Sequence, residues 1–148
     1  MRRFMHSHSD VCIVGNGAIA KTTALAFAQA GQSVTLLCPA SPPAAALAAK
    51  PAEPSWDVRV YALNHTAHQL LSSLKVWGAL EADRVAPVDA MLVNGDGAQA
   101  GGLGFDAYGA HVGTLAWIIE DRNLGQALDA ALKFAPNVNV VQGRASRL

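Results

Sequence analysis

Residues 10–39 read DVCIVGNGAIAKTTALAFAQAGQSVTLLCP, and this stretch decides the fold. An apolar run at 11–14 predicts a short buried strand, and the alanine-rich segment 18–30 carries apolar residues near helical spacing. Gly31 ends the predicted helix, and a second apolar run that ends at Cys38 predicts another buried strand. A strand, a helix and a strand in this order form a βαβ unit, whose strands must be parallel and whose crossover should be right-handed.

Two nucleotide-binding motifs overlap at the turn after the first strand. Gly15, Gly17 and Ala20 match the dinucleotide fingerprint G-x-G-x-x-A. Gly15, Lys21 and Thr22 nearly match the triphosphate-binding loop, which has a glycine before its lysine. Ala20 stands at that glycine and resists the backbone that the loop needs, whereas the dinucleotide motif accepts any small residue there. We therefore predict a dinucleotide whose pyrophosphate faces the helix N-terminus.

The end of the second strand leaves the choice of dinucleotide open. An acid commonly binds the ribose hydroxyls at this position, and Cys38 stands in its place. No arginine follows closely to hold a 2′-phosphate. The residues alone are compatible with FAD and with NAD(P), and a glycine turn without any ligand is the less favoured alternative.

The composition is that of a globular protein with enough residues for one domain. The chain has 148 residues, 51% of them hydrophobic, and its 11 Lys and Arg balance its 11 Asp and Glu. Without a basic stripe we expect no nucleic-acid partner, and no uncharged apolar run reaches the roughly 18 residues of a membrane span. Cys12 and Cys38 lie too far apart on neighbouring strands to form a disulfide, which predicts reduced thiols in a cytoplasmic protein.

The chain after the βαβ unit changes character. A proline-rich connection at 39–56, with one helical turn expected at 44–49, leads to an extended segment at 56–63. Asn64 can cap a helix that runs to about Trp77. We expect three leucines on the inner face of this helix: Leu70, Leu71 and Leu74.

The remaining residues predict antiparallel strands, a helix and a last strand. Residues 85–119 contain strand-like pieces separated by Asn-Gly, Asp-Gly and Gly-Gly turns, which is an antiparallel pattern. Asp121 is expected to cap the last helix, and VNVV at 138–141 to form the final strand. The apolar face of that helix is expected to carry Leu124, Leu128, Ala131 and Leu132.

Several segments of this chain match the motifs of one enzyme family and occur in the same order. DVRVYAL at 57–63 fits a D-x-R-x-x-A-L pattern, and Trp77 stands near the end of the helix that follows. VDAMLVNGDG at 88–97 and AWIIEDRNLGQAL at 116–128 match the later β segment, strand, acid and helix. With the glycine turn, these segments resemble the flavin-dependent aromatic hydroxylases, and they are similar in particular to the ubiquinone-biosynthesis hydroxylases. The resemblance covers the chain from residue 10 onward, except for the loose stretch 39–56.

The resemblance implies an α/β fold, namely a Rossmann-like FAD-binding βαβ domain with an inserted, incomplete antiparallel β segment. Residues 1–9 would form a flexible tail. The FAD-binding domain would comprise 10–84 and 119–148, and 85–118 would begin the sheet of a substrate domain. Two further family motifs are absent from this sequence: an apolar strand that ends in Asp-Gly, and a Gly-Asp-Ala-type segment that closes over the ribityl chain of the flavin. We therefore expect the chain alone to be inactive.

The implied activity is that of an FAD-dependent monooxygenase, which hydroxylates an aromatic ring in ubiquinone biosynthesis with O₂ and NAD(P)H as transient reductant. The implied substrate is a small aromatic or polyprenylated phenol, and the implied setting is the cytoplasm, with peripheral association with the inner face of the membrane or with a quinone-biosynthesis complex. Because the flavin carries the chemistry, we expect neither a catalytic triad nor a metal site. The alternatives are an NAD(P)-dependent reductase and a non-catalytic nucleotide-binding fragment.

The resemblance also implies which residues bind the cofactor. Arg59 would lie beside the flavin side of FAD and Arg122 would open the later helix near the cofactor, and a surface charge is the alternative for each. His65 and His68 are expected to be a surface or flavin-edge pair rather than metal ligands. The full set of expected cofactor-binding residues is Gly15, Asn16, Gly17, Ala18, Ile19, Ala20, Cys38, Arg59 and Arg122.

Overall fold

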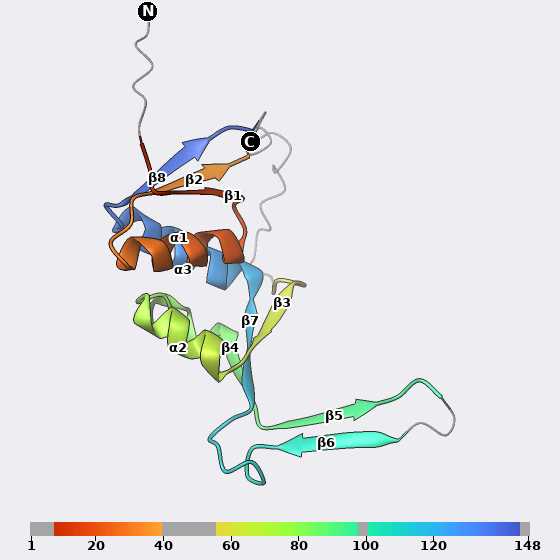
Figure 1. Cartoon of the computed structure of the whole chain (residues 1–148). Coiled ribbons are helices and arrows are strands. Elements are labelled where there is room, and N and C mark those ends of the chain that lie inside the picture. The colour runs from red at the N-terminus through yellow and green to blue at the C-terminus, as the bar shows by residue number, and fades with distance from the viewer. Residues whose placement is uncertain (1–7, 40–55, 98–100, 146–148) are drawn as a thin grey trace, which may run out of the picture. The chain divides into compact units, whose positions relative to one another are not determined.

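The computed structural model of the chain describes residues 8–39, 56–97 and 101–145 (Figure 1). The chain divides into two compact units. The first unit comprises Met1–Ser55 and Gly125–Leu148, and the second comprises Trp56–Leu124. The helical turn expected at 44–49 lies outside the described residues.

The first unit is built on a parallel sheet of three strands in the order β1-β2-β8. The helix α1 joins β1 to β2, and both strand pairs are parallel, so the predicted βαβ unit is confirmed. Helices α1 and α3 lie on one face of this sheet (Figure 1). The elements are β1 (Val11–Val14), α1 (Ala18–Gln29), β2 (Val34–Cys38), α3 (Asp121–Lys133) and β8 (Val138–Gln142). The first four residues of α3, 121–124, belong to the second unit.

The two strands of the βαβ unit differ in burial. β2 buries Val34, Leu36 and Cys38, as predicted for a central strand. β1 is an edge strand in which half-buried residues alternate with exposed ones, and Val14 is 55% exposed. The prediction that the first strand is buried is therefore wrong. It failed because a short apolar run does not tell whether one or both faces of a strand are covered.

The second unit contains an antiparallel sheet in the order β3-β7-β4 and a separate two-stranded hairpin, β5-β6. The antiparallel pattern predicted for 85–119 is confirmed, although its strands belong to two different sheets. Every residue of β5 and β6 is exposed. The strands are β3 (Val60–Leu63), β4 (Val85–Val88), β5 (Ala90–Asn94), β6 (Gly102–Asp106) and β7 (Ala116–Glu120).

Helix α2 (His65–Ser73) begins as predicted and ends early. The Asn64 side chain accepts a hydrogen bond from the Ala67 N–H at 2.9 Å, which confirms the cap. The helix ends before the predicted residue Trp77, because Lys75 adopts a left-handed conformation with φ 62°. Leu71 and Leu74 are buried as expected, whereas Leu70 is 43% exposed and does not belong to the inner face.

Helix α3 begins at Asp121 itself, so this residue lies in the first turn and is not a flanking cap. Its apolar face is buried at Leu124, Leu128 and Leu132, as expected, whereas Ala131 is only half-buried. Within the described part of the chain, no helix combines the length and the apolar character that crossing a membrane requires. The division of the chain into an FAD-binding domain and a substrate segment stays a prediction.

Candidate functional site

The turn between β1 and α1 is three residues long and is shaped by its glycines. Gly15 adopts φ +144°, a conformation that residues with a side chain rarely adopt. A Cβ on Gly15 would also lie 3.2 Å from the Ala20 Cβ, so positions 15 and 20 both need a small residue. Gly17 is the N-cap of α1, and a Cβ there would meet nothing within 4 Å. A side chain at position 17 would therefore begin in open space.

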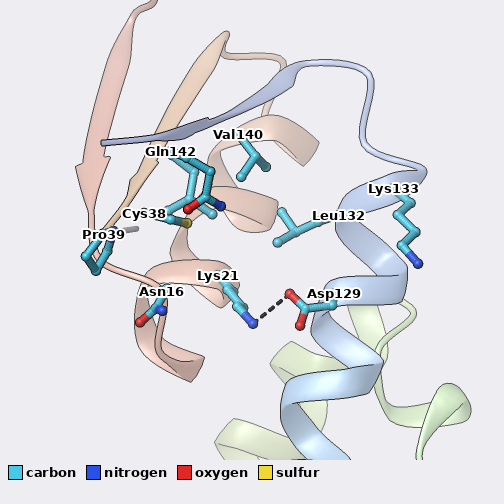
Figure 2. Close-up of a pocket in the computed structure, with 10 residues that line it drawn as sticks. Asn16, Lys21, Cys38, Pro39, Asp129, Leu132, Lys133, Val140 and Gln142 are labelled. Carbon is cyan, nitrogen blue, oxygen red and sulfur yellow. Dashed lines mark ion pairs between the residues drawn. The ribbon is translucent and has the colours of Figure 1, made fainter. Parts of the chain in front are cut away.

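The position of Lys21 decides between the two overlapping motifs. In a triphosphate-binding loop, the backbone before the lysine curls around the phosphates. Here the helix begins at Ala18, and the Lys21 N–H already donates to the Gly17 carbonyl at 3.1 Å. The Lys21 ammonium points toward Asp129 and forms an ion pair at 2.6 Å with 14% of the lysine side chain exposed (Figure 2). The turn has the geometry of the dinucleotide motif.

A pocket of about 580 Å³ lies beside this turn (Figure 2). Cys38 and Gln142 are register partners at the ends of β2 and β8, and both line the pocket. Ligands of open parallel sheets bind at the carboxyl ends of the strands, and Cys38 and Gln142 place part of the pocket lining there. The polar and charged residues that line it are Asn16, Lys21, Asp129, Lys133 and Gln142.

Cys38 ends β2 as predicted and turns its thiol toward the glycine turn. Its Sγ donates a weak hydrogen bond to the Gly15 carbonyl at 3.6 Å, and the residue is 6% exposed. A thiol is a weak donor and a weak acceptor, so it offers little to a ribose hydroxyl. The pocket wall at this position is therefore only weakly polar.

In the second unit, one carboxylate joins the D-x-R segment to the start of α3. Asp57 Oδ1 accepts from the Arg59 N–H and Asp57 Oδ2 from the Arg122 N–H, each at 3.1 Å. The Asp121 N–H donates to the Arg59 carbonyl at 2.9 Å. The bond from the Arg59 N–H is the main cause that holds the pKa of Asp57 below its usual value. The Tyr61 hydroxyl donates to Asp121 Oδ1 at 2.9 Å, which raises the pKa of Tyr61 above 10.0.

A buried ion pair supports this segment. The Glu120 carboxylate is nearly fully buried and accepts from Arg84 Nη1 at 2.9 and 3.0 Å. The Asp57 N–H donates to Glu120 Oε2 at 3.3 Å, and the Arg84 guanidinium lies 4.8 Å from the centre of the Trp56 ring. Sequence reasoning gave neither residue a role, because Arg84 stands in no motif and Glu120, although it lies in the segment 116–128, has its partner on a distant segment. A charged residue at the end of an apolar strand was the only signal for Glu120.

The predicted cofactor-binding residues fall into both units. Residues 15–20 and Cys38 belong to the first unit, where the turn and the pocket bring them together. Arg59 and Arg122 belong to the second unit, where Asp57 brings their backbones together. That these residues bind a cofactor stays a prediction.

His65 and His68 lie in an aromatic cluster of the second unit. The His68 ring stacks on Trp117 with 4.6 Å between ring centres and meets Trp77 edge-on at 4.2 Å. His65 Nε2 forms a hydrogen bond with the Thr114 carbonyl at 2.8 Å and packs edge-on against Trp117. These contacts account for both histidines by packing within α2 and its neighbours.

The sequence and the fold both have relatives among flavin enzymes. No family model matches the sequence. The chain is 27% identical over 143 residues to ubiquinone hydroxylase UbiM from Neisseria meningitidis, an alignment that covers 93% of this chain and 29% of that protein. The predicted resemblance to ubiquinone-biosynthesis hydroxylases is thus confirmed, and the chain spans less than a third of the curated relative that it matches.

Two solved structures have the same fold over almost the whole chain. The p-nitrophenol 4-monooxygenase PnpA from Pseudomonas putida matches with a TM-score of 0.60 and 19% identity, over 89% of this chain and 31% of that one. The flavin-dependent monooxygenase PieE, solved in complex with FAD and substrate, matches with a TM-score of 0.60 and 18% identity, over 93% of this chain and 24% of that one. The chain therefore has the mixed helix and sheet fold found in flavin-dependent monooxygenases.

Proposed function

We propose that this chain forms the FAD-binding part of a flavin-dependent monooxygenase. The observation that carries the proposal is the turn before α1, where a Cβ on Gly17 would meet open space in front of a helix N-terminus. The N–H groups and the positive dipole end of a helix favour a phosphate at such a place. The fold shared with PnpA and PieE supports a flavin dinucleotide as the occupant.

Each part of FAD has a proposed set of partners. The adenosine enters the pocket beside Cys38, and Arg59 and Arg122 bind the flavin side of the cofactor. Bound FAD supplies the oxygen chemistry, while this chain's residues bind and orient the cofactor. The proposed partners of the pyrophosphate are Gly15, Asn16, Gly17, Ala18, Ile19 and Ala20.

We extend the proposal to the whole protein, which would hydroxylate an aromatic ring in ubiquinone biosynthesis with NAD(P)H as transient reductant. The likeness to ubiquinone hydroxylase UbiM supports this extension. The substrate would be a small aromatic or polyprenylated phenol, and a polyprenylated one would bring the protein to the membrane surface or into a quinone-biosynthesis complex. Because the chain spans 29% of that relative, turnover is not proposed for these 148 residues by themselves.

The Gly17→Val variant tests the proposal. Its branched side chain would occupy the space that the pyrophosphate needs, but it would touch no protein atom at Cβ. Several charge-assisted hydrogen bonds of about 1.5–3 kcal/mol each would be lost. We expect FAD affinity to fall about 100-fold or more, while the thermal midpoint changes little. FAD, ADP and NADPH are titrated into the purified chain by calorimetry.

Gly113→Val is the matched control, because a Cβ on Gly113 also meets nothing within 4 Å and this glycine belongs to the second unit. It should leave FAD affinity unchanged. Equal FAD affinity in the Gly17→Val variant and the unaltered chain would sink the proposal. Tighter binding of NADPH than of FAD would favour the reductase alternative.

A further inference from the structure

The ends of β2 and β8 form one wall of the pocket in the first unit. Leu36 is the register partner of Val140, and Cys38 is the register partner of Gln142. Side chains two places apart on a strand point to the same face of a sheet, and all four of these residues line the pocket. The wall therefore begins with an apolar pair and ends, at the carboxyl ends of both strands, with a thiol and an amide.

The apolar part of this wall is left open at one residue. Val140 is 46% exposed, whereas Leu36 on β2 and Leu132 on α3, which line the same pocket, are buried. Pockets for small molecules combine such apolar surfaces with a few polar groups that fix the orientation of the ligand. A flat, apolar ring face of a ligand can therefore pack against Val140.

The Gln142 side chain supplies a polar group beside this apolar surface (Figure 2). Among the described residues, no hydrogen bond engages its amide. The thiol of Cys38, its register partner, is turned to the Gly15 carbonyl instead. A glutamine amide has one acceptor oxygen and an NH₂ group with two donors. It can therefore accept from a ligand and donate to it at the same time.

Adenine presents the matching pair of groups. Its amino group is a donor and a ring nitrogen beside it is an acceptor, and glutamine binds such a pair with two hydrogen bonds. The charged residues that line the pocket cannot do both, because Lys21 and Lys133 only donate and Asp129 only accepts. The other amide of the lining, on Asn16, belongs to the glycine turn that is proposed for the pyrophosphate. Gln142 is thus the amide that is left for the base.

We propose that Gln142 determines the specificity of the pocket for adenine. Its carbonyl oxygen accepts from the amino group of the base, its NH₂ group donates to the adjacent ring nitrogen, and the ring packs on Val140. The inference rests on the proposed function and deepens it, because it names the residue that recognises the base of the dinucleotide. The competing explanation is that Gln142 is a solvated residue at the end of a strand.

Removal of the amino group from the ligand tests the inference in the unaltered chain. ADP is compared by calorimetry with purine riboside 5′-diphosphate, in which a hydrogen replaces the amino group. One neutral hydrogen bond is lost, so the analogue should bind about fivefold more weakly. Equal affinities for the two nucleotides would overturn the inference without any variant of the protein.

Gln142→Leu removes both hydrogen bonds and keeps a side chain of similar size. ADP affinity should fall about tenfold, and the preference for ADP over its analogue should disappear. A solvated glutamine predicts neither change. Gln142→Glu keeps an acceptor for the amino group and loses the donor, so it should bind ADP more weakly than the unaltered chain does but retain the preference. A Gln142→Leu variant that folds and keeps the full preference would overturn the inference.

Asn139→Leu is the matched control. It makes the same change from an amide to leucine on the same strand, but side chains three places apart point to opposite faces, and Asn139 does not line the pocket. The affinity for ADP and the preference over the analogue should both stay as they are in the unaltered chain. Equal losses in Asn139→Leu and Gln142→Leu would assign the effect to β8 as a whole and overturn the role of Gln142.

Inorganic pyrophosphate, which has no base, separates failure of this inference from failure of the proposed function. It should bind the unaltered chain and the Gln142→Leu variant with the same affinity. Binding of pyrophosphate and ADP without a preference for the amino group would overturn the inference and leave the proposed function standing. If none of pyrophosphate, ADP and FAD binds the unaltered chain, both are overturned.

Discussion

The two units position their candidate binding residues by different means. In the first unit the backbone makes the site, because Gly15 turns at φ +144° and Gly17 then begins α1. In the second unit a side chain positions the candidate residues, because the Asp57 carboxylate joins Arg59 to Arg122, which lie on two distant segments. A backbone turn depends on its own few residues, whereas a side-chain network depends on the folded unit around it. The two regions should therefore respond differently to substitution.

The largest effect is expected from Arg84→Ala in the second unit. This change leaves the Glu120 carboxylate buried without its charged partner, which typically costs about 3–5 kcal/mol. Unfolding by urea, followed by tryptophan fluorescence, measures the loss, because all three tryptophans of the chain belong to this unit: Trp56, Trp77 and Trp117.

Glu81→Ala is the control for this prediction. Glu81 pairs with the same arginine at 3.4 Å, but 60% of its side chain is exposed, and exposed pairs contribute about 0–1 kcal/mol. Its backbone bonds to Asn123 do not involve the side chain that is removed. Equal urea midpoints for Arg84→Ala and Glu81→Ala would show that the buried pair does not hold the second unit together.

A smaller effect is expected from Gly15→Ala in the first unit. Alanine at φ +144° is strained, and its Cβ would also lie 3.2 Å from that of Ala20, for a cost of about 1–3 kcal/mol. Faster amide hydrogen exchange in β2 would report the loss. Gly17→Ala, which meets open space at an ordinary φ of −78°, is the control and should cost less than about 1 kcal/mol. If the two variants exchanged equally, the turn would not depend on the conformation of Gly15.

The same contrast explains what the sequence could predict. The glycine turn and the Asn64 cap are each set by residues within a few places of one another, and both are confirmed. The βαβ unit is also confirmed, because its three elements follow one another directly in the chain and each has its own pattern. The predicted end of α2 is wrong because Lys75 adopts a left-handed conformation, for which lysine has no special preference. Where such a helix ends depends on what packs around its last turn, and the local sequence does not contain this information.

The network of the second unit could not be predicted from a single sequence. The resemblance singles out the D-x-R segment but gives its aspartate no role, because two of the partners of Asp57, Glu120 and Arg122, lie on β7 and α3. Asp121 was expected to cap α3, since a carboxylate before an apolar helix face is a typical cap. The carboxylate that accepts from the first turn comes instead from Asp57, and only the folded chain brings it there.

The smallest effect is expected at the pocket of the first unit, from Cys38→Glu. The thiol donates only a weak bond to the Gly15 carbonyl, whereas a carboxylate could reach further into the pocket and accept from the ribose hydroxyls of FAD. One hydrogen bond to a charged group contributes about 1.5 kcal/mol, or about tenfold in affinity. Cys12→Glu, at an exposed position on β1, is the control for the added charge and should leave affinity unchanged. Titration of the two variants with FAD measures the difference, and their thermal midpoints show whether the new carboxylate is tolerated. If the Cys38→Glu variant keeps its fold but binds FAD no more tightly, the ribose lies elsewhere and the pocket beside the glycine turn is not the adenosine site.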